Sequence, residues 1–190
     1  MMSTRDKILE VGREVAQAEG YGALSFREIG KTVGISSASI HHHFPTKGDL
    51  GEALAKRYRE DAQVSLEKLA TSEADPKQCL KKYVAGFRST LANGNRMCLC
   101  GLLGAEYDNL PPAVRTEVKA FGDVNIEWLR TILARFSEGT TKLDILPIEA
   151  RAEAIFAAIG GAQLAARSRG DIAIYDRIIE IYRSTGLIPL

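Results

Sequence analysis

The chain has 190 residues, of which 45% are hydrophobic and 26% are charged, and its formal net charge at pH 7 is +1. These values are typical of a globular protein, and no apolar run approaches the roughly 18 residues of a membrane span. The segment MMSTRDKILE also lacks the apolar stretch of a signal peptide, so we expect a cytoplasmic protein whose three cysteines are reduced thiols.

The first predicted helix covers residues 4 to 20. Ser3 and Asp6 have the spacing of a capping box, in which each side chain accepts a hydrogen bond from the other residue's backbone N–H. The segment Gly20-Tyr21-Gly22 is suited to end the helix. The residues with helical period are Ile8, Gly12, Val15, Ala16 and Glu19.

Residues 25 to 45 predict two short helices joined by a tight turn, which is a helix-turn-helix. Ser25 and Glu28 have the spacing of a second capping box, and Gly34 is placed to end the first helix of the pair. The small Gly30 would let the second helix cross closely. The buried stripe of the first helix is Phe26, Ile29, Gly30 and Val33.

The second helix of the pair begins after Ser36, a favourable N-cap residue, and stops before Pro45. Ile40 and Phe44 form its inner face. These few apolar residues cannot make a stable unit alone, so both helices must pack on residues 4 to 20. The sequence therefore predicts a three-helix head.

The rest of the chain also has helical periodicity. Predicted helices cover residues 47–70, 77–91, 113–136, 148–169 and 172–185, with a break predicted over 137–147. The segment MCLCGLLGAEYDNLPP receives no assignment. No segment alternates with the period of a strand, so we predict an all-α protein of about nine helices, with an N-terminal head and a helical C-terminal body.

The head resembles the N-terminal DNA-binding domain of the TetR/AcrR family of bacterial transcriptional regulators. The matching residues are S-F-R-E-I-G (25 to 30), V-G-I-S (33 to 36), I-H-H-H-F (40 to 44) and T-K-G-D-L (46 to 50). The resemblance implies a helix-turn-helix DNA-binding domain over residues 1–47 and an effector-binding and dimerisation domain over 48–190. The chain departs from the family at Gly30, where alanine is usual, and at His41, where a tyrosine usually grips a DNA phosphate.

The resemblance also implies DNA contacts on the head. Thr46 is placed to cap the next helix, with Lys47 where a phosphate would sit. Residues 1–50 carry six basic and six acidic side chains, so DNA binding is indicated by the motif and not by bulk charge. The predicted DNA-binding residues are Arg27, Ser36, Ser37, Ala38, Ser39, His41, His42 and Lys47.

In the family, the last two helices usually pair with their copies in a second subunit. The segment IFAAIGGAQLAA, residues 155–166, suits a homodimer because its alanines and glycines allow helices to approach closely. An ordinary helix contact within the chain is the alternative. The predicted interface residues are Phe156, Ile159, Gly160, Gln163, Leu164, Tyr175 and Ile178.

The family also implies an effector pocket among the central helices, although apolar residues at helical spacing are core residues by default. Asn125 is a better candidate than Glu127 for a buried polar contact in the helix that both share, with a plain surface position as the alternative for either residue. The candidate pocket residues are Tyr83, Phe87, Cys98, Leu102, Leu103, Phe121, Asn125 and Trp128.

Two further patterns concern metal and thiol chemistry. Consecutive helical residues point about 100° apart, so His41-His42-His43 cannot converge on one metal ion, and we expect no metal or other cofactor. Cys98 and Cys100 would lie on opposite sides of a helix, where they neither chelate together nor pair easily as a disulfide. We interpret them as buried thiols, with ligand contact or a thiol switch as the alternative.

The leading hypothesis is a homodimeric transcription factor, in this family most often a repressor, that binds a palindromic operator in double-stranded DNA and is released by a small-molecule effector. A thiol-based redox or electrophile sensor acting through Cys98 or Cys100 is the first alternative. An enzyme is disfavoured because the three histidines lie in the head and no glycine-rich phosphate loop or acid pair is present. A DNA architectural protein without an effector is the last alternative.

Overall fold

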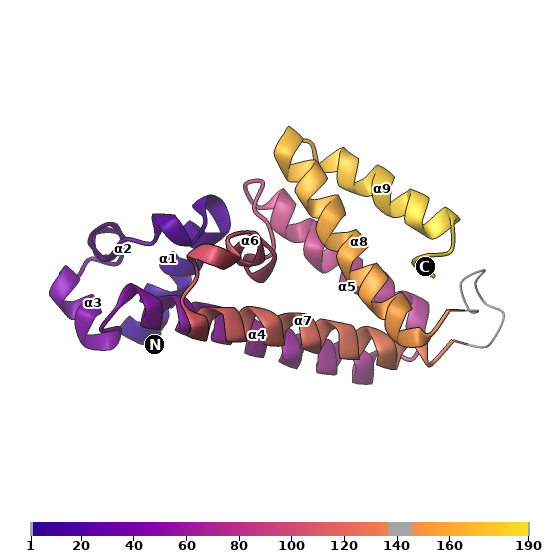
Figure 1. Cartoon of the computed structure of the whole chain (residues 1–190), viewed down its shortest axis with the longest axis horizontal. Coiled ribbons are helices and arrows are strands. Elements are labelled where there is room, and N and C mark those ends of the chain that lie inside the picture. The colour runs from indigo at the N-terminus through magenta and orange to yellow at the C-terminus, as the bar shows by residue number, and fades with distance from the viewer. Residues whose placement is uncertain (1, 137–145, 190) are drawn as a thin grey trace. The chain divides into compact units, whose positions relative to one another are not determined.

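A computed structural model describes residues 2–136 and 146–189. Within these residues it contains nine α-helices, two short 3-10 helices and no strand (Figure 1). The predicted all-α class is therefore confirmed. The break predicted over residues 137–147 falls mostly outside the described residues.

The chain divides into two compact units. Unit 1 consists of Met1–Glu60 and Leu99–Phe121, and unit 2 consists of Asp61–Cys98 and Gly122–Leu190. The helices α4 (Lys47–Ser72) and α7 (Pro112–Leu133) each contribute residues to both units. The remaining helices belong to one unit each.

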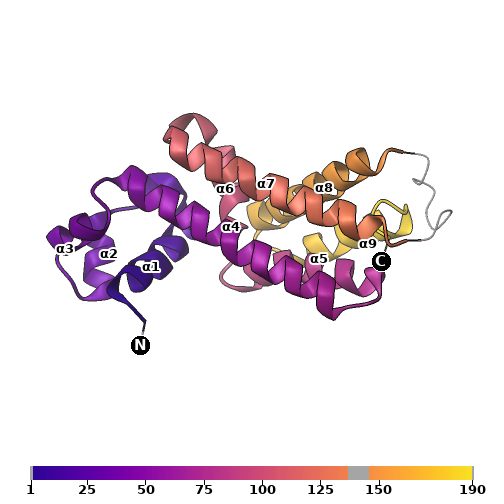
Figure 2. The same cartoon turned by 90° about the horizontal axis from the view of Figure 1, so that it is seen from below.

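Unit 1 begins with the predicted head, in which α1 (Thr4–Glu19), the 3-10 helix η1 (Tyr21–Ala23), α2 (Phe26–Val33) and α3 (Ser37–His43) gather around the start of α4 (Figure 2). The capping box predicted for α1 is present, since Ser3 Oγ accepts from Asp6 N–H at 3.1 Å and the Asp6 carboxylate accepts from Ser3 N–H at 3.3 Å. Gly20 ends α1 with a positive φ of 88°.

The core of unit 1 joins the head to a helix that the sequence pattern did not predict. This helix, α6 (Leu99–Ala105), packs on α1 and is followed by the 3-10 helix η2 (Tyr107–Asn109). Leu99 and Leu103 of α6 are buried in the same apolar cluster as the inner residues of the head. That cluster includes Ile8, Leu9, Ile29, Ile40, Phe44, Leu50, Leu54 and Val114.

Unit 2 contains α5 (Pro76–Ala92), α8 (Ile148–Arg169) and α9 (Ile172–Ser184), together with the later parts of α4 and α7. Helix α8 packs against both α9 and α5 (Figure 1). Gly170, with φ of 61°, ends α8, and the Asp171 side chain caps α9 by accepting from Ala173 N–H at 2.9 Å. The core of this unit includes Leu80, Tyr83, Trp128, Leu129, Ile132, Ile155, Ile159 and Tyr175.

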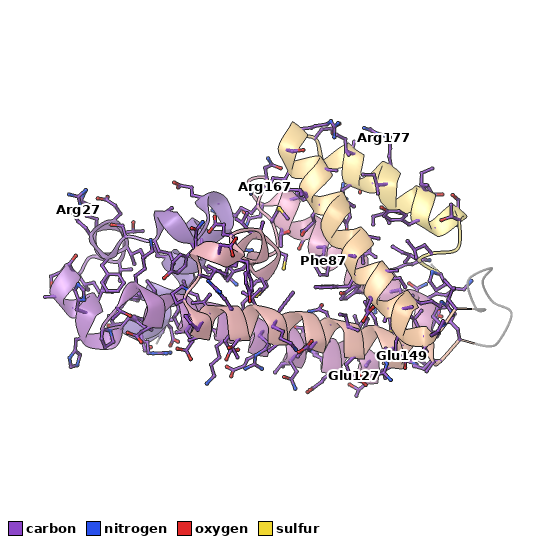
Figure 3. The ribbon with its side chains drawn as sticks, in the orientation of Figure 1. Arg27, Phe87, Glu127, Glu149, Arg167 and Arg177 are labelled. Atoms are coloured by element: carbon purple, nitrogen blue, oxygen red, sulfur yellow. The ribbon has the colours of Figure 1, made fainter. Side chains whose placement is uncertain are left out.

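Ion pairs tie the helices of unit 2 together at its surface. Arg130 of α7 binds Glu127 at 2.7 Å and Glu149 of α8 at 3.0 Å, and the two carboxylates lie near one another in Figure 3. Arg88 of α5 forms a two-point contact with Asp176 of α9, at 2.7 and 2.8 Å. The Arg88 contact lowers the pKa of Asp176. None of the described helices is long and apolar enough to cross a lipid bilayer.

Candidate nucleic-acid interface and effector-binding core

The predicted helix-turn-helix is present as α2 and α3. Ser25 Oγ accepts from Glu28 N–H at 3.5 Å, and Gly34 ends α2 in the left-handed conformation, with φ of 82°. The second half of the predicted capping box is replaced, because Lys31 and Arg27 hold the Glu28 carboxylate at 3.1 and 2.9 Å. These contacts, led by Lys31, lower the pKa of Glu28.

The turn between the two helices depends on a glycine. A Cβ atom on Gly30 would lie 2.8 Å from the Ile35 carbonyl oxygen, closer than side-chain carbons approach oxygen. The Ile35 N–H also donates to the Gly30 carbonyl at 2.9 Å. The prediction that Gly30 permits a close crossing is therefore confirmed, and the chain after α2 turns tightly enough to place α3 across it.

Helix α3 presents a polar face to solvent. Ser36 caps it by accepting from Ser39 N–H at 3.1 Å, and its hydroxyl also lies 2.9 Å from the Ser39 hydroxyl. Ile40 is completely buried, so the opposite side of the helix faces out. The exposed side chains of the cap and helix are those of Ser36, Ala38, Ser39, His41 and His42, with Ser37 half-buried at the edge.

Of the other predicted DNA contacts, Arg27 remains outside while Lys47 is engaged within the chain. Arg27 projects from α2 away from the head, with 79% of its side chain exposed (Figure 3). The Lys47 ammonium donates to the Gly22 carbonyl at 2.7 Å and lies 4.9 Å from the centre of the Tyr21 ring. The Lys47 ammonium therefore has partners within the chain, and its remaining N–H donors are available to a phosphate.

The predicted cap of α4 at Thr46 is confirmed and takes the form of a full box. The Thr46 hydroxyl accepts from Asp49 N–H at 3.1 Å, and the Asp49 carboxylate accepts from the Thr46 N–H and hydroxyl at 2.8 and 2.7 Å. The first turn of α4 therefore carries its own anion, which partly satisfies the positive end of the helix dipole.

A contact that the sequence reasoning missed joins the end of α6 to the head. The Glu106 carboxylate accepts from Tyr21 N–H at 2.8 Å. A Cβ on Gly20 would lie 1.9 Å from one Glu106 oxygen, so a side chain at position 20 would displace this carboxylate. Nothing in the local pattern of residues around Glu106 distinguishes it from other surface carboxylates, and only the fold brings it to the α1–α2 connection.

The interior of unit 2 holds an aromatic cluster with buried polar groups. The Tyr83 ring stacks on Trp128 with centroids 4.9 Å apart and meets Phe87 edge-on at 5.1 Å. The Tyr83 hydroxyl donates to the Asn125 side-chain oxygen at 3.0 Å, which confirms the predicted buried contact of Asn125, and Glu127 is exposed. Burial raises the pKa of Tyr83 well above its ordinary value.

The predicted pocket residues are divided between the two units. Tyr83, Phe87, Cys98, Asn125 and Trp128 belong to unit 2, whereas Leu102, Leu103 and Phe121 belong to unit 1. In unit 1, Phe121 packs against Tyr58 with ring centroids 5.4 Å apart. Each group therefore lies within one unit, and unit 2 holds five of the eight predicted pocket residues.

Three of the predicted interface residues point into unit 2, contrary to the prediction that they face a partner. Ile159 and Gln163 are completely buried and Tyr175 is 1% exposed, so these side chains are covered by the rest of the chain and cannot contact a partner. Gln163 donates to the Phe87 carbonyl at 2.7 Å and the Thr90 hydroxyl at 2.6 Å, and it accepts from Cys98 N–H at 3.3 Å. Tyr175 donates to the Val84 carbonyl at 2.9 Å.

Part of the exposed surface of α8 and α9 is apolar. Leu164 is 55% exposed and Ile181 is 59% exposed. We call this surface the α8–α9 face and define it by Ala154, Ala157, Gly161 and Leu164 of α8 with Ile181 of α9, all exposed. The other predicted interface residues, Phe156, Gly160 and Ile178, are half-buried.

All three cysteines are free thiols inside the protein. Cys79 is completely buried, and Cys98 and Cys100 are each 3% exposed. The Cys79 sulfur lies 3.7 Å from the Arg135 guanidinium, which also donates to the Glu73 carbonyl at 2.7 Å. Among the described residues, no group of three or more His, Cys, Asp or Glu side chains is placed to hold a metal ion.

A three-helix head that exposes the second helix of a tight pair is the architecture of a helix-turn-helix DNA-binding protein. Residues 8–54 match the family described as "Bacterial regulatory proteins, tetR family". The Bacillus subtilis (strain 168) protein named "Probable HTH-type transcriptional regulator YttP" is 34% identical over 71 residues, which are 37% of this chain and 34% of that protein. The match thus spans about a third of that relative's length.

Two solved structures share the architecture of both units. A TetR-family transcriptional regulator from Agrobacterium tumefaciens is 32% identical, with a TM-score of 0.84 over 93% of this chain and 94% of that one. A TetR transcriptional regulator from Legionella pneumophila is 28% identical, with a TM-score of 0.86 over 97% and 98%. The chain therefore belongs to the TetR family, and it is a DNA-binding transcriptional regulator.

Proposed function

We propose that the protein is a homodimeric repressor that binds a palindromic operator and is released by a small-molecule effector. Residues 1–47 form the DNA-binding domain in this proposal, and residues 48–190 form the effector-binding and dimerisation domain. The observation that carries the proposal is the exposed polar face of α3, held in place by the buried Ile40 and Phe44.

The face of α3 has the chemistry needed to read DNA. Hydroxyl and imidazole groups donate and accept hydrogen bonds at base edges and phosphates, and Ala38 can meet a thymine methyl group. Arg27 and Lys47 would supply phosphate contacts at either side of the helix. Because the head has no excess of positive charge, a single head binds DNA weakly, and two heads held together are needed for a stable complex.

The α8–α9 face supports a second copy of the chain as the partner. On α8, the exposed Leu164 follows Ala154, Ala157 and Gly161 at helical spacing, and these small residues let a helix of another subunit approach closely. Ile181 is the large exposed apolar side chain of α9. Phe156, Gly160 and Ile178 would be covered at its margin. Such a dimer places two α3 helices in successive major grooves when they are roughly 34–36 Å apart.

The aromatic interior of unit 2 supports an effector that is at least partly apolar and carries a hydrogen-bonding group. Phe87 and Trp128 offer apolar contact area, and Tyr83 and Asn125 offer a donor and an acceptor that are currently paired with each other. Cys98 is also buried in this unit. Its backbone N–H donates to Gln163, which in turn donates to the Phe87 carbonyl.

Release of DNA requires only that the effector bind one arrangement of the protein more tightly than another. An effector that favours an arrangement in which the two heads do not match successive grooves lowers operator affinity by the ratio of its two binding constants. Helix α4 links the head to the effector-binding domain and would carry this change.

Selection of bound sequences from a random duplex library, followed by a salt titration on the selected duplex, tests the DNA-binding part. We expect a palindrome with half-sites about one helical turn apart. Ala38→Asp adds a carboxylate to the face of α3 and should weaken binding by at least about a hundredfold, because it meets the phosphates or base edges directly. Ala85→Asp adds the same charge on the exposed side of α5 and serves as the matched control.

Three outcomes of these experiments have different meanings. Absence of any enriched sequence at every salt concentration would overturn the proposal. Normal binding by Ala38→Asp would show that α3 is not the reading helix. Equal loss in both variants would point to a general charge effect.

The thiol-sensor alternative is tested with the same duplex. The 3% exposure of Cys98 and Cys100 leaves either thiol poorly placed to react, so it favours the pocket. We would replace both cysteines with alanine, because serine would bury an extra hydroxyl. A compound that still releases the double variant from the operator acts through the pocket, and a response lost only in that variant indicates a thiol switch.

A further inference from the structure

We propose that His41 binds a DNA phosphate only in its charged imidazolium form, so that operator binding takes up a proton at each subunit. The inference rests on the proposed function and adds a dependence on pH to it. It starts from one hydrogen bond in the head.

The His41 Nδ1 atom lies 3.1 Å from the Pro45 carbonyl oxygen, at the end of the same helix. A carbonyl oxygen has no proton to donate, so the hydrogen in this contact belongs to Nδ1. A neutral imidazole carries only one N–H. When His41 is neutral, its other nitrogen, Nε2, is therefore a hydrogen-bond acceptor.

This assignment decides what the ring can do at a phosphate. Phosphate oxygens are also acceptors, so a neutral His41 with its proton on Nδ1 offers them a lone pair and no hydrogen bond. Protonation places a second N–H on Nε2 and adds a positive charge, which turns the same ring into a charge-assisted donor. The exposed position of His41 on α3 leaves it accessible to DNA.

The ring is held in this orientation by a neighbouring aromatic side chain. Phe26 of α2 meets His41 edge-on, with ring centroids 4.6 Å apart and planes at 68°. Turning the ring to direct Nδ1 outward would break the Pro45 bond and disturb the Phe26 contact. Moving the proton from Nδ1 to Nε2 without turning the ring would also lose the Pro45 bond, so a neutral His41 can donate outward only at a cost that the charged form does not have.

The charged groups on the surrounding elements have other partners. On α2, Glu28 is held by Lys31 and Arg27. At the start of α4, Asp49 is held by Thr46, and Lys47 donates to Gly22.

On α1, Arg5 lies over the Phe44 ring, at 5.1 Å, and Asp6 is bound by Ser3 and by Arg57 of α4. On α3 itself, the rings of His42 and His43 meet edge-on, 5.6 Å apart. The phosphate is thus the anion that would stabilise a charged His41.

The test is operator affinity between pH 6 and pH 8 at constant ionic strength, using the duplex obtained by selection. We expect the affinity of the dimer to fall by about ten- to a hundredfold across this range, because each subunit must take up a proton to bind and protons become scarcer as the pH rises. His41→Tyr provides a hydroxyl donor whose charge does not change, so it should remove this dependence. His42→Gln is the matched control on the same face and should keep it, whatever its effect on affinity.

Two further measurements make the result specific. Calorimetry of the binding reaction in two buffers of different ionisation enthalpy should show net proton uptake by the wild type that is lost in His41→Tyr. Nitrogen NMR of the free protein at high pH should show the His41 proton on Nδ1. Detection of the proton on Nε2 would overturn the proposal, as would wild-type affinity that is independent of pH.

Retention of the pH dependence by His41→Tyr, or its loss in His42→Gln alone, would also overturn the proposal. Failure to select any duplex would overturn the proposed function, and this inference with it. A selected duplex whose binding does not respond to pH would overturn this inference alone.

Discussion

Single buried polar residues fix how the helices of unit 2 meet. Gln163 makes three hydrogen bonds from the centre of α8 to α5 and to the segment before α6, and Tyr83 joins α5 to α7 through Asn125. Hydrogen bonds of this kind add only about 1 kcal/mol each, but leaving one buried partner unsatisfied costs more. These residues therefore specify which faces of α5, α7 and α8 pack against each other.

Gln163→Leu should lower the free energy of unfolding by about 1–3 kcal/mol, because the buried Cys98 N–H loses its acceptor. Urea denaturation at a fixed protein concentration measures the change. Glu153→Ala, at an exposed position of the same helix, is the control and should change the value by no more than about 0.5 kcal/mol. Equal stability of the two variants would contradict the role given to Gln163.

The buried tyrosines predict loss of stability in alkali. Burial raises the pKa values of both Tyr83 and Tyr175, so above about pH 10 the unfolded chain releases phenolic protons that the folded protein retains. The unfolded state then binds fewer protons, and stability falls as pH rises. Below the ordinary tyrosine pKa these two groups have no such effect.

Of the six tyrosines, Tyr83 and Tyr175 should ionise last, together with unfolding, in a titration followed by phenolate absorbance. The double variant Tyr83→Phe with Tyr175→Phe should lose less of its stability between pH 9 and pH 11 than the wild type. Tyr107→Phe, at a side chain that is 54% exposed, should behave as the wild type does. Ionisation of all six tyrosines in the folded protein would show that the interior admits solvent.

At the scale of elements, the connection from α1 to α2 links the head to α6 through Glu106. Gly20→Ala should lower the free energy of unfolding by about 1–3 kcal/mol or more. A φ of 88° strains any residue other than glycine, and the new Cβ would displace the Glu106 carboxylate. Gly22→Ala, two residues away, meets nothing within 4 Å and provides the control. Urea midpoints measure both, and similar values would refute the strain at Gly20.

Helices with distinct end signals were predictable from the sequence, and those without were not. Ser3, Gly34, Ser36 and Pro45 marked the helices of the head because caps and breakers act locally. The short helix α6 escaped prediction because its seven residues, LCGLLGA, are apolar or small on every side and show no period.

The predicted interface residues of α8 included the buried Ile159 and Gln163 for a related physical reason. Its apolar and small residues surround the helix, so spacing alone does not tell Gln163, which is buried, from Leu164, which is exposed. Interactions between distant segments, such as that of Glu106 with Tyr21, depend on the completed fold. The DNA-reading residues were predicted from the family motif, and their roles remain predictions.

At the scale of the whole molecule, dimerisation should decide operator affinity. Leu164→Arg with Ile181→Arg places two charges on the α8–α9 face and should give a monomer by light scattering. Operator affinity should fall by at least about a hundredfold, since one head retains only half of the phosphate contacts. Val64→Arg, at a 65% exposed apolar residue of α4, is the control. A double variant that remains dimeric would place the subunit contact elsewhere.

The pairing of Glu28 with Arg27 and Lys31 also affects how the protein would find its site on a chromosome. Two cations of α2, the helix before the reading helix, already have a carboxylate partner, and residues 1–50 carry equal numbers of acidic and basic groups. Attraction to arbitrary DNA, which depends on released counterions, is therefore weak. Most copies would search by short collisions from solution and not by sliding, and they would meet an effector while unattached.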